Sequence, residues 1–286
     1  MKMNIGTKSQ IKLIALLSVL LIALAGAGCL GQNSSDQKVV SSGSTTVLPL
    51  MQDLAENFMD THRDVLISVK GGGSGVGIAE LIDGSNDIAM SSRKIRNNEV
   101  ADAKANGVTV VEHIIAYDGI TVIINPSNNV SNLTVEQLQK IYSGEIRNWQ
   151  EVGGADSTIT VIARDSASGT QEFFTEAVMG NVSYRNDMIV QAATGAVTQE
   201  VSQNERAIGI IGAAYQISTV KAVAVNVDGT EVMPTEENIL NGVYPISRGL
   251  YLYTDEAMSK AAADFIAFIL SPAGQKIVKD MGYAPV

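Results

Sequence analysis

The chain has 286 residues, of which 45% are hydrophobic, and a formal net charge of −10 that comes from 20 Lys and Arg against 30 Asp and Glu. This length favours two lobes over one, and the acidic balance argues against a nucleic-acid-binding protein, because such proteins present a basic face to phosphates. A site for a small anion therefore has to be local, built from N–H and hydroxyl donors with one or two arginines, whose contacts outweigh charges screened over about 10 Å.

The first segment, residues 1–28, has the pattern of a lipoprotein-type signal peptide. A basic start precedes an apolar run at 13–25, and small residues follow immediately before Cys29, the single cysteine of the chain. Cys29 is therefore a candidate for lipidation, and no disulfide within the chain is possible. The position three before the cysteine holds Gly26 and not the usual large aliphatic residue, so secretion without a lipid is the alternative. Residues 29–37 are predicted to form a flexible tether, because the stretch from Gly31 to Gln37 has nothing to bury.

From residue 38 onward, strand and helix patterns alternate. The predicted elements of the first part are, in order, a strand starting at 38, a helix at 47–58, a strand at 65–70, a helix around 78–82 and a strand at 87–90. Runs of small hydroxyl residues and glycine occupy the first two junctions that lead from a strand into a helix, Ser42–Thr46 and Gly71–Gly75. The last strand ends at Ser91-Ser92-Arg93.

The apolar stretch at 114–125 contains Asp118-Gly119, which interrupts a single buried strand, and this pattern is expected of a strand that crosses between two lobes. A second crossing is predicted near 244–252. The predicted division gives lobe one residues 38–117 plus 248–286, and lobe two residues 118–247. One continuous doubly wound domain with a bend at the glycine is the alternative.

The second half repeats the order of strand, small-residue turn and helix. A strand at 158–163 leads into the hydroxyl run Arg164–Thr170, which precedes a helix pattern at 170–179. Further strands are predicted at 207–212, 222–227 and 249–253, and closing helices at 259–270 and 273–281. Such alternation predicts an α/β fold with ligand sites outside the carboxyl ends of the strands.

All three hydroxyl and glycine runs precede a predicted helix. A helix start has unpaired N–H groups and the positive end of the helix dipole, so each run is a candidate anion site. Together they favour one dehydrated oxyanion. The structural alternatives are that Thr45 and Thr46 only cap a helix, that the glycines form only a tight turn, and that Arg164 pairs with Asp165.

Enzyme signatures are missing from the sequence. The two histidines, His62 and His113, lie near no nucleophile-elbow serine, and no spacing of residues indicates a zinc or calcium site. We therefore expect a protein that is not an enzyme, with no catalytic residues, metal or cofactor.

The segments, taken in order, resemble the phosphate-binding proteins of ABC phosphate transporters, a branch of the periplasmic-type substrate-binding proteins. The resemblance covers nearly all of the mature chain and rests on these motifs: Gly43-Ser44-Thr45-Thr46 with Pro49, Gly71 to Gly75, Asp87 to Arg93, Leu133-Thr134 through Ile141 to Gly144 with Asn148-Trp149, Arg164 with Ser168-Gly169-Thr170, and the terminal Gly274-Gln275 and Gly282-Tyr283. It implies a two-lobed periplasmic-binding-protein-like (type II) fold, with a hinge and a ligand cleft between the lobes.

The resemblance also implies a function. Such a protein captures inorganic phosphate outside the cytoplasm, at the cell surface or in the periplasm, and delivers it to a permease and an ATPase that are separate chains. We expect a monomer anchored to the membrane by a lipid on Cys29, with no nucleic acid as partner.

The resemblance carries site residues over to this chain one by one. Thr45 and Thr46 match the first anion-contacting loop, Ser74 matches the second, and Arg164 matches the arginine that pairs with the oxyanion. The third loop corresponds to Ser168, Gly169 and Thr170. A planar guanidinium offers parallel donors to two oxygens, in charge-assisted hydrogen bonds about twice as strong as neutral ones.

Ser92 is a departure from the family. Well-studied members have an acidic residue there, whose carboxylate accepts the proton that phosphate still carries and so selects against sulfate. Asp118 is the candidate replacement, with a turn-forming role as its alternative. Arg93 is a candidate second donor, with lobe packing as its alternative.

Phosphate is the expected ligand, and other functions stay open. The same fold is compatible with sulfate, molybdate or tungstate. A phosphatase or phosphotransferase would use the same donors, but it needs a nucleophile, metal or base beside the anion. An interaction or signalling protein that kept the fold would bind no oxyanion.

Overall fold

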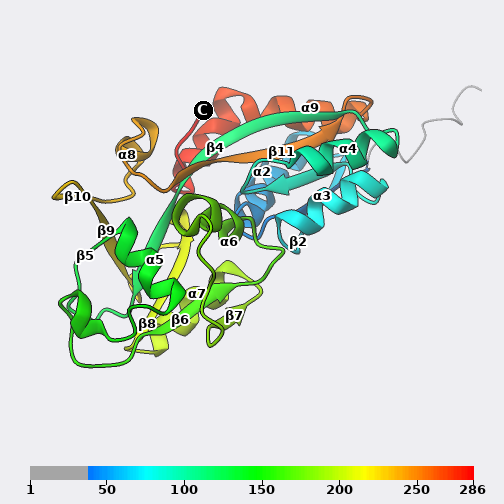
Figure 1. The fold of residues 1–286 in the computed structure, drawn as a ribbon. Helices are drawn as coiled ribbons and strands as arrows, with labels where there is room; N and C mark the ends of the chain where they lie inside the picture. Colours follow the sequence, from blue (N-terminus) through cyan, green and yellow to red (C-terminus); the bar gives the residue numbers. More distant parts are fainter. Residues whose placement is uncertain (1–37) are drawn as a thin grey trace, which may run out of the picture. The chain divides into compact units, whose positions relative to one another are not determined.

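Two long antiparallel strands, β4 (Val110–Ile124) and β11 (Ser247–Asp255), organise the fold. The computed structural model describes residues 38–286, so the predicted signal peptide, the tether and Cys29 lie outside the described residues. Figure 1 shows β4 and β11 running side by side, and they pair from Ser247 opposite Gly119 to Asp255 opposite Val110.

One group of strands lies beside β11, in the order β2, β1, β3, β11. Strand β1 is parallel to both of its neighbours, and β11 is antiparallel to β3. The strands of this group are β1 (Lys38–Gly43), β2 (Leu66–Gly71) and β3 (Ile88–Ser91). The helices that connect or follow them are α2 (Leu48–Thr61), α3 (Ser74–Asp83), α4 (Asn97–Ala105), α9 (Lys260–Leu270) and α10 (Pro272–Asp280).

A second group of strands continues from the other end of β4, in the order β4, β8, β6, β7, while β9 pairs with β4, β5 and β10. Its strands are β5 (Asn132–Thr134), β6 (Thr160–Arg164), β7 (Ile189–Gln191), β8 (Ala207–Gly212), β9 (Lys221–Val227) and β10 (Thr230–Val232). Its helical segments are α5 (Val135–Ser143), η1 (Trp149–Val152), α6 (Gly169–Phe174), η2 (Thr175–Met179), α7 (Thr194–Gln203), η3 (Ala213–Tyr215) and α8 (Glu236–Leu240).

Strand β4 changes partner at one peptide bond. Gly119 pairs with Ser247 of β11, and the next residue, Ile120, pairs with Gly212 of β8. The predicted interruption at Asp118-Gly119 is wrong, because ladder hydrogen bonds continue on both sides of it and β4 is one strand. Asp118 therefore does not form a turn, so the turn-forming role considered for it as an alternative is wrong as well.

The buried apolar side chains gather around the two strand groups. One large cluster draws on β1, α2, β3 and α9, and includes Leu50, Phe58 and Phe265. Another draws on the second half of β4, α5 and β8, and includes Tyr142 and Trp149. Each strand group thus has an apolar core of its own, and the change of partner in β4 lies between them.

Most predicted elements are confirmed within one to three residues at their ends, and the exceptions have local causes. The predicted helix at 170–179 is a short α-helix, α6, that continues as a π-helix, η2. Helices α4, α7 and α8 were not predicted. In α4 only Ala103 is buried, so it has little of the apolar periodicity that identifies a helix from sequence.

Across 38–286, no single helix combines the length and the apolar character that crossing a membrane requires, whereas α9 and α10 meet the requirement only as a pair, with a bend of 63° between them.

Candidate anion-binding site

The predicted site residues come together from four segments of the sequence: Thr45–Thr46, Ser74, Ser92 and Arg164–Thr170. Thr45 and Thr46 lie between β1 and α2, and Ser74 begins α3. Ser92 follows β3, and Arg164 ends β6. The last segment ends with Ser168 to Thr170, which form the start of α6.

Direct hydrogen bonds join the first loop to the third. Thr46 Oγ1 lies 3.1 Å from Thr170 Oγ1, and Arg164 Nη2 donates to Thr45 Oγ1 over 3.1 Å. A further threonine, Thr194 at the start of α7, lies 3.3 Å from Thr45 through its hydroxyl and accepts from Arg164 Nη1 over 3.0 Å. The hydroxyl groups and the guanidinium therefore form one connected cluster, in which Thr194 was not predicted.

The second loop closes against Ser92 and α6. Ser74 Oγ accepts the N–H of Ser92 over 3.0 Å and lies 3.3 Å from Ser92 Oγ. A Cβ on Gly169 would lie 2.7 Å from Ser92 Oγ, which is too close for a methyl group. Gly73, with φ of +102°, would place a Cβ 2.5 Å from the carbonyl oxygen of Ala167. Both positions require glycine so that the loops can approach one another.

Side-chain caps explain which hydroxyl groups stay available. Ser168 caps α6, since its Oγ accepts from the N–H of Gln171 over 3.3 Å. Thr45 and Thr46 cap nothing: the N-cap of α2 is Val47, without a side-chain cap, and Ser44 Oγ accepts the N–H groups of Thr46 and Val47. The structural alternative for Thr45 and Thr46, helix capping, is therefore wrong. Their hydroxyl groups face the cluster.

Arg164 is buried among neutral acceptors, with 4% of its surface exposed. Its Nε donates to the Gln191 carbonyl over 3.1 Å, and its Nη2 donates to the Ala192 carbonyl over 3.0 Å. Burial lowers its pKa to about 10, although Asp165 acts in the opposite direction. In residues 38–286 Arg164 forms no ion pair, so the alternative pairing with Asp165 is not observed. Its charge is available to an anion.

Asp118 and Arg248 form a buried ion pair beside the cluster. Arg248 Nη2 lies 3.0 Å from Asp118 Oδ2 and donates to Thr170 Oγ1 over 2.9 Å, while its Nη1 donates to the Ser92 carbonyl over 3.0 Å. Burial raises the pKa of Asp118, and Arg248 acts against that shift. A Cβ on Gly212 would touch both Asp118 Oδ2, at 2.7 Å, and Thr46 Cγ2, at 3.0 Å. Asp118 is thus close to both threonines that meet across the cluster.

Sequence reasoning missed Arg248 and two tyrosines that hold the first loop. Tyr283 Oη donates to the Thr46 carbonyl over 2.7 Å, and Tyr215 Oη donates to the Thr45 carbonyl. For these three residues, the sequence offered one signal, the Gly282-Tyr283 motif of the family resemblance, which contains Tyr283. Arg248 carried none, because it lies in a strand some 80 residues beyond the last hydroxyl run.

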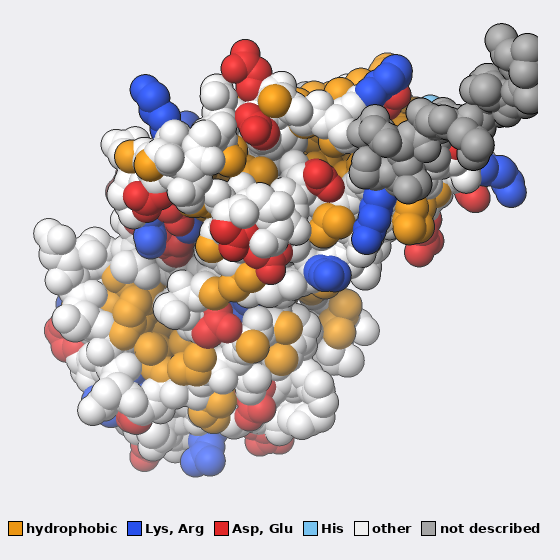
Figure 2. All heavy atoms as spheres, turned by 90° about the vertical axis from the view of Figure 1, so that its right-hand side faces the viewer, with side chains coloured by type: hydrophobic (Ala, Val, Ile, Leu, Met, Phe, Trp, Pro, Cys, Tyr) orange, Lys and Arg blue, Asp and Glu red, His pale blue; other side chains and the backbone are white. Residues whose placement is uncertain are grey.

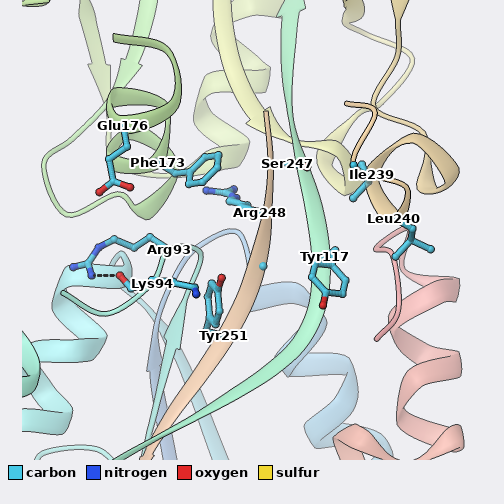
Figure 3. A pocket seen from close by; sticks show the side chains of 12 residues that line it. Arg93, Lys94, Tyr117, Phe173, Glu176, Ile239, Leu240, Ser247, Arg248 and Tyr251 are labelled. Carbon is cyan, nitrogen blue, oxygen red and sulfur yellow. Dashed lines mark hydrogen bonds between the residues drawn. The ribbon is translucent and has the colours of Figure 1, made fainter. Parts of the chain in front are cut away.

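Arg93 is engaged by carboxylates. Its guanidinium lies 2.6 Å from Glu99 and also contacts Glu172 of α6. Of the two roles considered for Arg93, packing between elements is the one observed. Arg93 and Arg248 both line a cavity of about 540 Å³, together with Phe173, Tyr117 and Tyr251 among others (Figure 3). None of the eight predicted ligand residues lines this cavity.

The charge distribution agrees with a local anion site. On the face drawn in Figure 2, Lys and Arg side chains stand singly among Asp and Glu, with no broad basic field. The cluster has its own positive charge from two of the buried arginines, Arg164, which has no carboxylate partner among residues 38–286, and Arg248, which is paired with Asp118. Such a cluster of hydroxyl groups and guanidinium groups, gathered from loops at the ends of strands, defines a binding protein for a small anion.

Comparison with known proteins identifies the class. Residues 31–273 match the family described as PBP superfamily domain. A phosphate ABC transporter substrate-binding protein from Clostridium perfringens, solved with bound phosphate, is 37% identical, with a TM-score of 0.80 over 87% of this chain and 99% of that one. The fold is therefore the two-lobed type II fold of periplasmic phosphate-binding proteins.

Two relatives identify the family. The phosphate-binding protein PstS of Staphylococcus saprophyticus is 34% identical over 93% of this chain and 86% of its own length. PstS of Bacillus subtilis is 31% identical over 98% of this chain and 95% of its own length. The chain belongs to the PstS family of phosphate-binding proteins.

Proposed function

We propose that this protein captures inorganic phosphate between two lobes and delivers it to an ABC-type phosphate importer. One observation carries the proposal: Arg164, buried and without a carboxylate partner among the described residues, lies in hydrogen-bonding contact with the hydroxyl groups of Thr45 and Thr194. A tetraoxyanion supplies the negative charge that this buried guanidinium lacks, and charge-assisted hydrogen bonds to its oxygens are stronger than those to neutral acceptors. The names of the similar proteins support phosphate as that anion.

The proposed lobes are residues 38–117 with 248–286, and residues 118–247. The two apolar clusters support this division, because nearly all members of each come from one side of it. The change of partner in β4, between Gly119 and Ile120, lies within two residues of the proposed boundary and supports it. Strand β11 begins at Ser247 and would provide the second crossing.

In the proposed site, Arg164 contacts two anion oxygens. The hydroxyl groups of Thr45, Thr46, Ser74, Ser92 and Thr170 donate to the others, together with the amides of Gly169 and Thr170 at the start of α6, which have no acceptor within the helix. Ser168 contributes to anion binding through its backbone and by capping α6, which holds the start of that helix in place. Arg248 adds a second positive charge through its contact with Thr170.

Asp118 is the proposed selectivity residue. Ser92 can accept or donate, so it does not repel an anion that lacks a proton. Asp118, near both Thr46 and Thr170, is positioned to accept the proton of hydrogen phosphate through an oxygen that retains a free lone pair. Sulfate has no such proton, so it would bring its own oxygens against the Asp118 carboxylate without a hydrogen bond between them.

We propose binding without turnover. His62 stacks on Phe58 with ring centroids 4.0 Å apart, and His113 contacts Thr254 over 3.0 Å, so neither adjoins the hydroxyl cluster. The relatives carry the names of binding proteins, which favours this reading over a phosphatase. Release of phosphate from an ester by the purified protein would reinstate the phosphatase.

Calorimetric titration with phosphate, arsenate, sulfate, molybdate and tungstate tests the proposal. We expect phosphate and arsenate to bind and sulfate to bind much more weakly. Arg164→Ala should weaken phosphate binding by about 3 to 5 kcal/mol, because it removes one side of a buried charge pair. Arg147→Ala, at an exposed arginine, should have no effect. Preference for another oxyanion, or unchanged affinity in Arg164→Ala, contradicts the assignment.

The transport partners are proposed as a separate permease and ATPase, with the binding protein acting as a monomer outside the cytoplasm. Lipid anchoring through Cys29 is part of this proposal, and Cys29 lies outside the described residues. Cys29→Ser should release the protein from the membrane fraction of the producing cells. Continued membrane association of that variant would refute the anchor.

A further inference from the structure

Two segments that bear proposed ligand residues are also joined by ion pairs. Glu172, two residues after Thr170 on α6, contacts the guanidinium groups of both Arg93 and Arg96. Arg93 directly follows Ser92, another proposed ligand residue. The ion pairs therefore lie next to two of the groups that would hold the anion, and they connect the two proposed lobes.

The arginine side of this contact is held in place. Glu99 of α4 accepts two hydrogen bonds from Arg93, of 2.8 Å from Nη1 and 2.6 Å from Nη2, and accepts the N–H of Arg96 over 2.8 Å. Ser91 Oγ donates to the Arg93 carbonyl over 2.8 Å and accepts the Arg93 N–H over 3.3 Å. Glu99 and Ser91 thus hold Arg93 in position independently of Glu172, and its Nε forms the ion pair with Glu172.

Glu172 is shielded from solvent. The exposed fraction of its side chain is 11%, against 4% for Arg93 and 52% for Arg96. Charges in such a partly buried position are screened less than pairs on an open surface. Burial raises the pKa of Glu172, and Glu99 and Glu176 add to this rise, while Arg93 and Arg96 act against it.

We propose that Glu172 is a positioning residue that holds the two lobes closed through Arg93 and Arg96, and so sets the rate at which bound phosphate leaves. This inference rests on the proposed phosphate binding and lobe division. Glu172 itself does not contact the anion. Opening the cleft has to break both ion pairs and hydrate a carboxylate and a guanidinium that are buried when it is closed, so the ion pairs slow opening more than closing.

A neighbouring glutamate, Glu176, offers a matched control. Glu176 lies one turn further along the same helical segment and faces the cavity beside Arg93 (Figure 3). Within residues 38–286 it forms no ion pair within 4.0 Å. Glu176→Gln therefore removes the same charge from nearly the same place while leaving the ion pairs intact.

Stopped-flow measurement of phosphate dissociation from the full-length protein tests the proposal. We expect Glu172→Gln and, separately, Arg96→Gln to raise the dissociation rate about three- to tenfold, while the association rate changes less than twofold. Glu176→Gln should stay within twofold of the unmodified protein. In the double variant Arg96→Gln/Glu172→Gln, the fold-increase in the phosphate dissociation rate should not exceed the product of the two single fold-increases. The reason is that both substitutions remove the same ion pair.

Salt dependence separates an ion-pair role from a purely structural one. Raising NaCl from about 0.05 to 0.5 M should speed dissociation from the unmodified protein and have much less effect on Glu172→Gln, since salt screens the charges that become exposed as the ion pairs separate, and Glu172→Gln lacks these ion pairs. A dissociation rate in Glu172→Gln equal to that of Glu176→Gln overturns the proposal. So does an equal salt response of Glu172→Gln and the unmodified protein. Neither result would affect the proposed function, which fails only if the unmodified protein binds no phosphate.

Discussion

Asp118 and Arg248 form an ion pair in which each side chain is only 1% exposed, with Arg248 Nη2 at 3.0 Å from Asp118 Oδ2. The pair also has contacts to the anion cluster, because the same Nη2 donates to Thr170 Oγ1 over 2.9 Å. A buried pair of this kind is weak evidence for stability, since desolvation offsets most of the attraction. Its position beside Thr170 fits a role in ligand choice.

Replacement of Asp118 should change selectivity. In Asp118→Asn the side chain keeps its size, but Arg248 loses its counter-charge and the amide can donate to an anion as well as accept from it. We expect the affinity for sulfate to rise and the preference for phosphate over sulfate to fall at least tenfold. Calorimetric titration with both anions measures this ratio.

Asp165→Asn is the control for that experiment, because it removes an acid that lies beside Arg164 in sequence without touching the Arg248 pair. It should leave the ratio unchanged. Equal ratios in Asp118→Asn and the unmodified protein would remove Asp118 from the selectivity mechanism. The melting temperature of Asp118→Asn should fall, since a buried guanidinium left without its partner costs about 3 to 5 kcal/mol.

Gly169→Ala should open the site without unfolding the protein. The added methyl group would lie 2.7 Å from Ser92 Oγ and also meet Ser74, so α6 has to move away from the second loop. We expect phosphate affinity to drop at least tenfold while the circular dichroism spectrum is retained. Gly195→Ala is the matched control, because nothing lies within 4 Å of the added group there. Comparable affinities in the two variants would contradict the close approach at Gly169.

The fold and the loops of the site could be predicted because their signals are local. A strand, a run of hydroxyl residues and an apolar helix face are each contained in about 20 residues, as at Thr45 and Thr46 or at Arg164 to Thr170. Strand β8 was predicted with its observed bounds, Ala207–Gly212, because all six residues are buried and apolar or glycine. Predictions of this type need no knowledge of what lies across the fold.

The remaining parts of the site depend on tertiary contacts. Arg248 is a single arginine in strand β11, and only the pairing of that strand with β4 brings it to Asp118. Thr194 begins a helix, α7, whose apolar pattern is weak, and it approaches Arg164 through strand pairing between β6 and β7. No spacing in the sequence encodes these contacts, so residue type alone could not mark either residue.

Tyr283→Phe should loosen the first loop. The Tyr283 hydroxyl donates to the Thr46 carbonyl over 2.7 Å, and the ring is almost fully buried. Phenylalanine keeps the packing but leaves that carbonyl without this donor, which costs about 1 to 3 kcal/mol. We expect a lower melting temperature and a smaller loss in phosphate affinity than in Arg164→Ala. Unchanged stability would mean that water replaces the hydroxyl, and unchanged affinity would show that Thr46 keeps its position without Tyr283.

Glu99 predicts a pH dependence of stability. Burial acts to raise its pKa, but the Arg93 guanidinium and the Arg96 N–H overcome that effect and hold the pKa below the ordinary value for glutamate. Because the folded pKa is lowered, the carboxylate contributes stability above the unfolded pKa, about 4.3. That contribution is lost as the pH falls through the lower, folded value. The unmodified protein should therefore lose stability in acid faster than Glu99→Gln does.

Thermal unfolding at pH 7 and at steps from pH 5 to pH 3 measures the difference between the two. At pH 7 we expect Glu99→Gln to be less stable by about 1 to 2 kcal/mol, since glutamine keeps the shape but not the charge that Arg93 requires. The two melting curves should converge as the pH falls below about 4.3. Glu56→Gln, at an exposed position on α2, should show no such convergence. If the difference in stability between the two proteins stays constant down to pH 3, Glu99 acts through its shape and not through its charge. The charge of Glu99 would then not be what holds Arg93 in position.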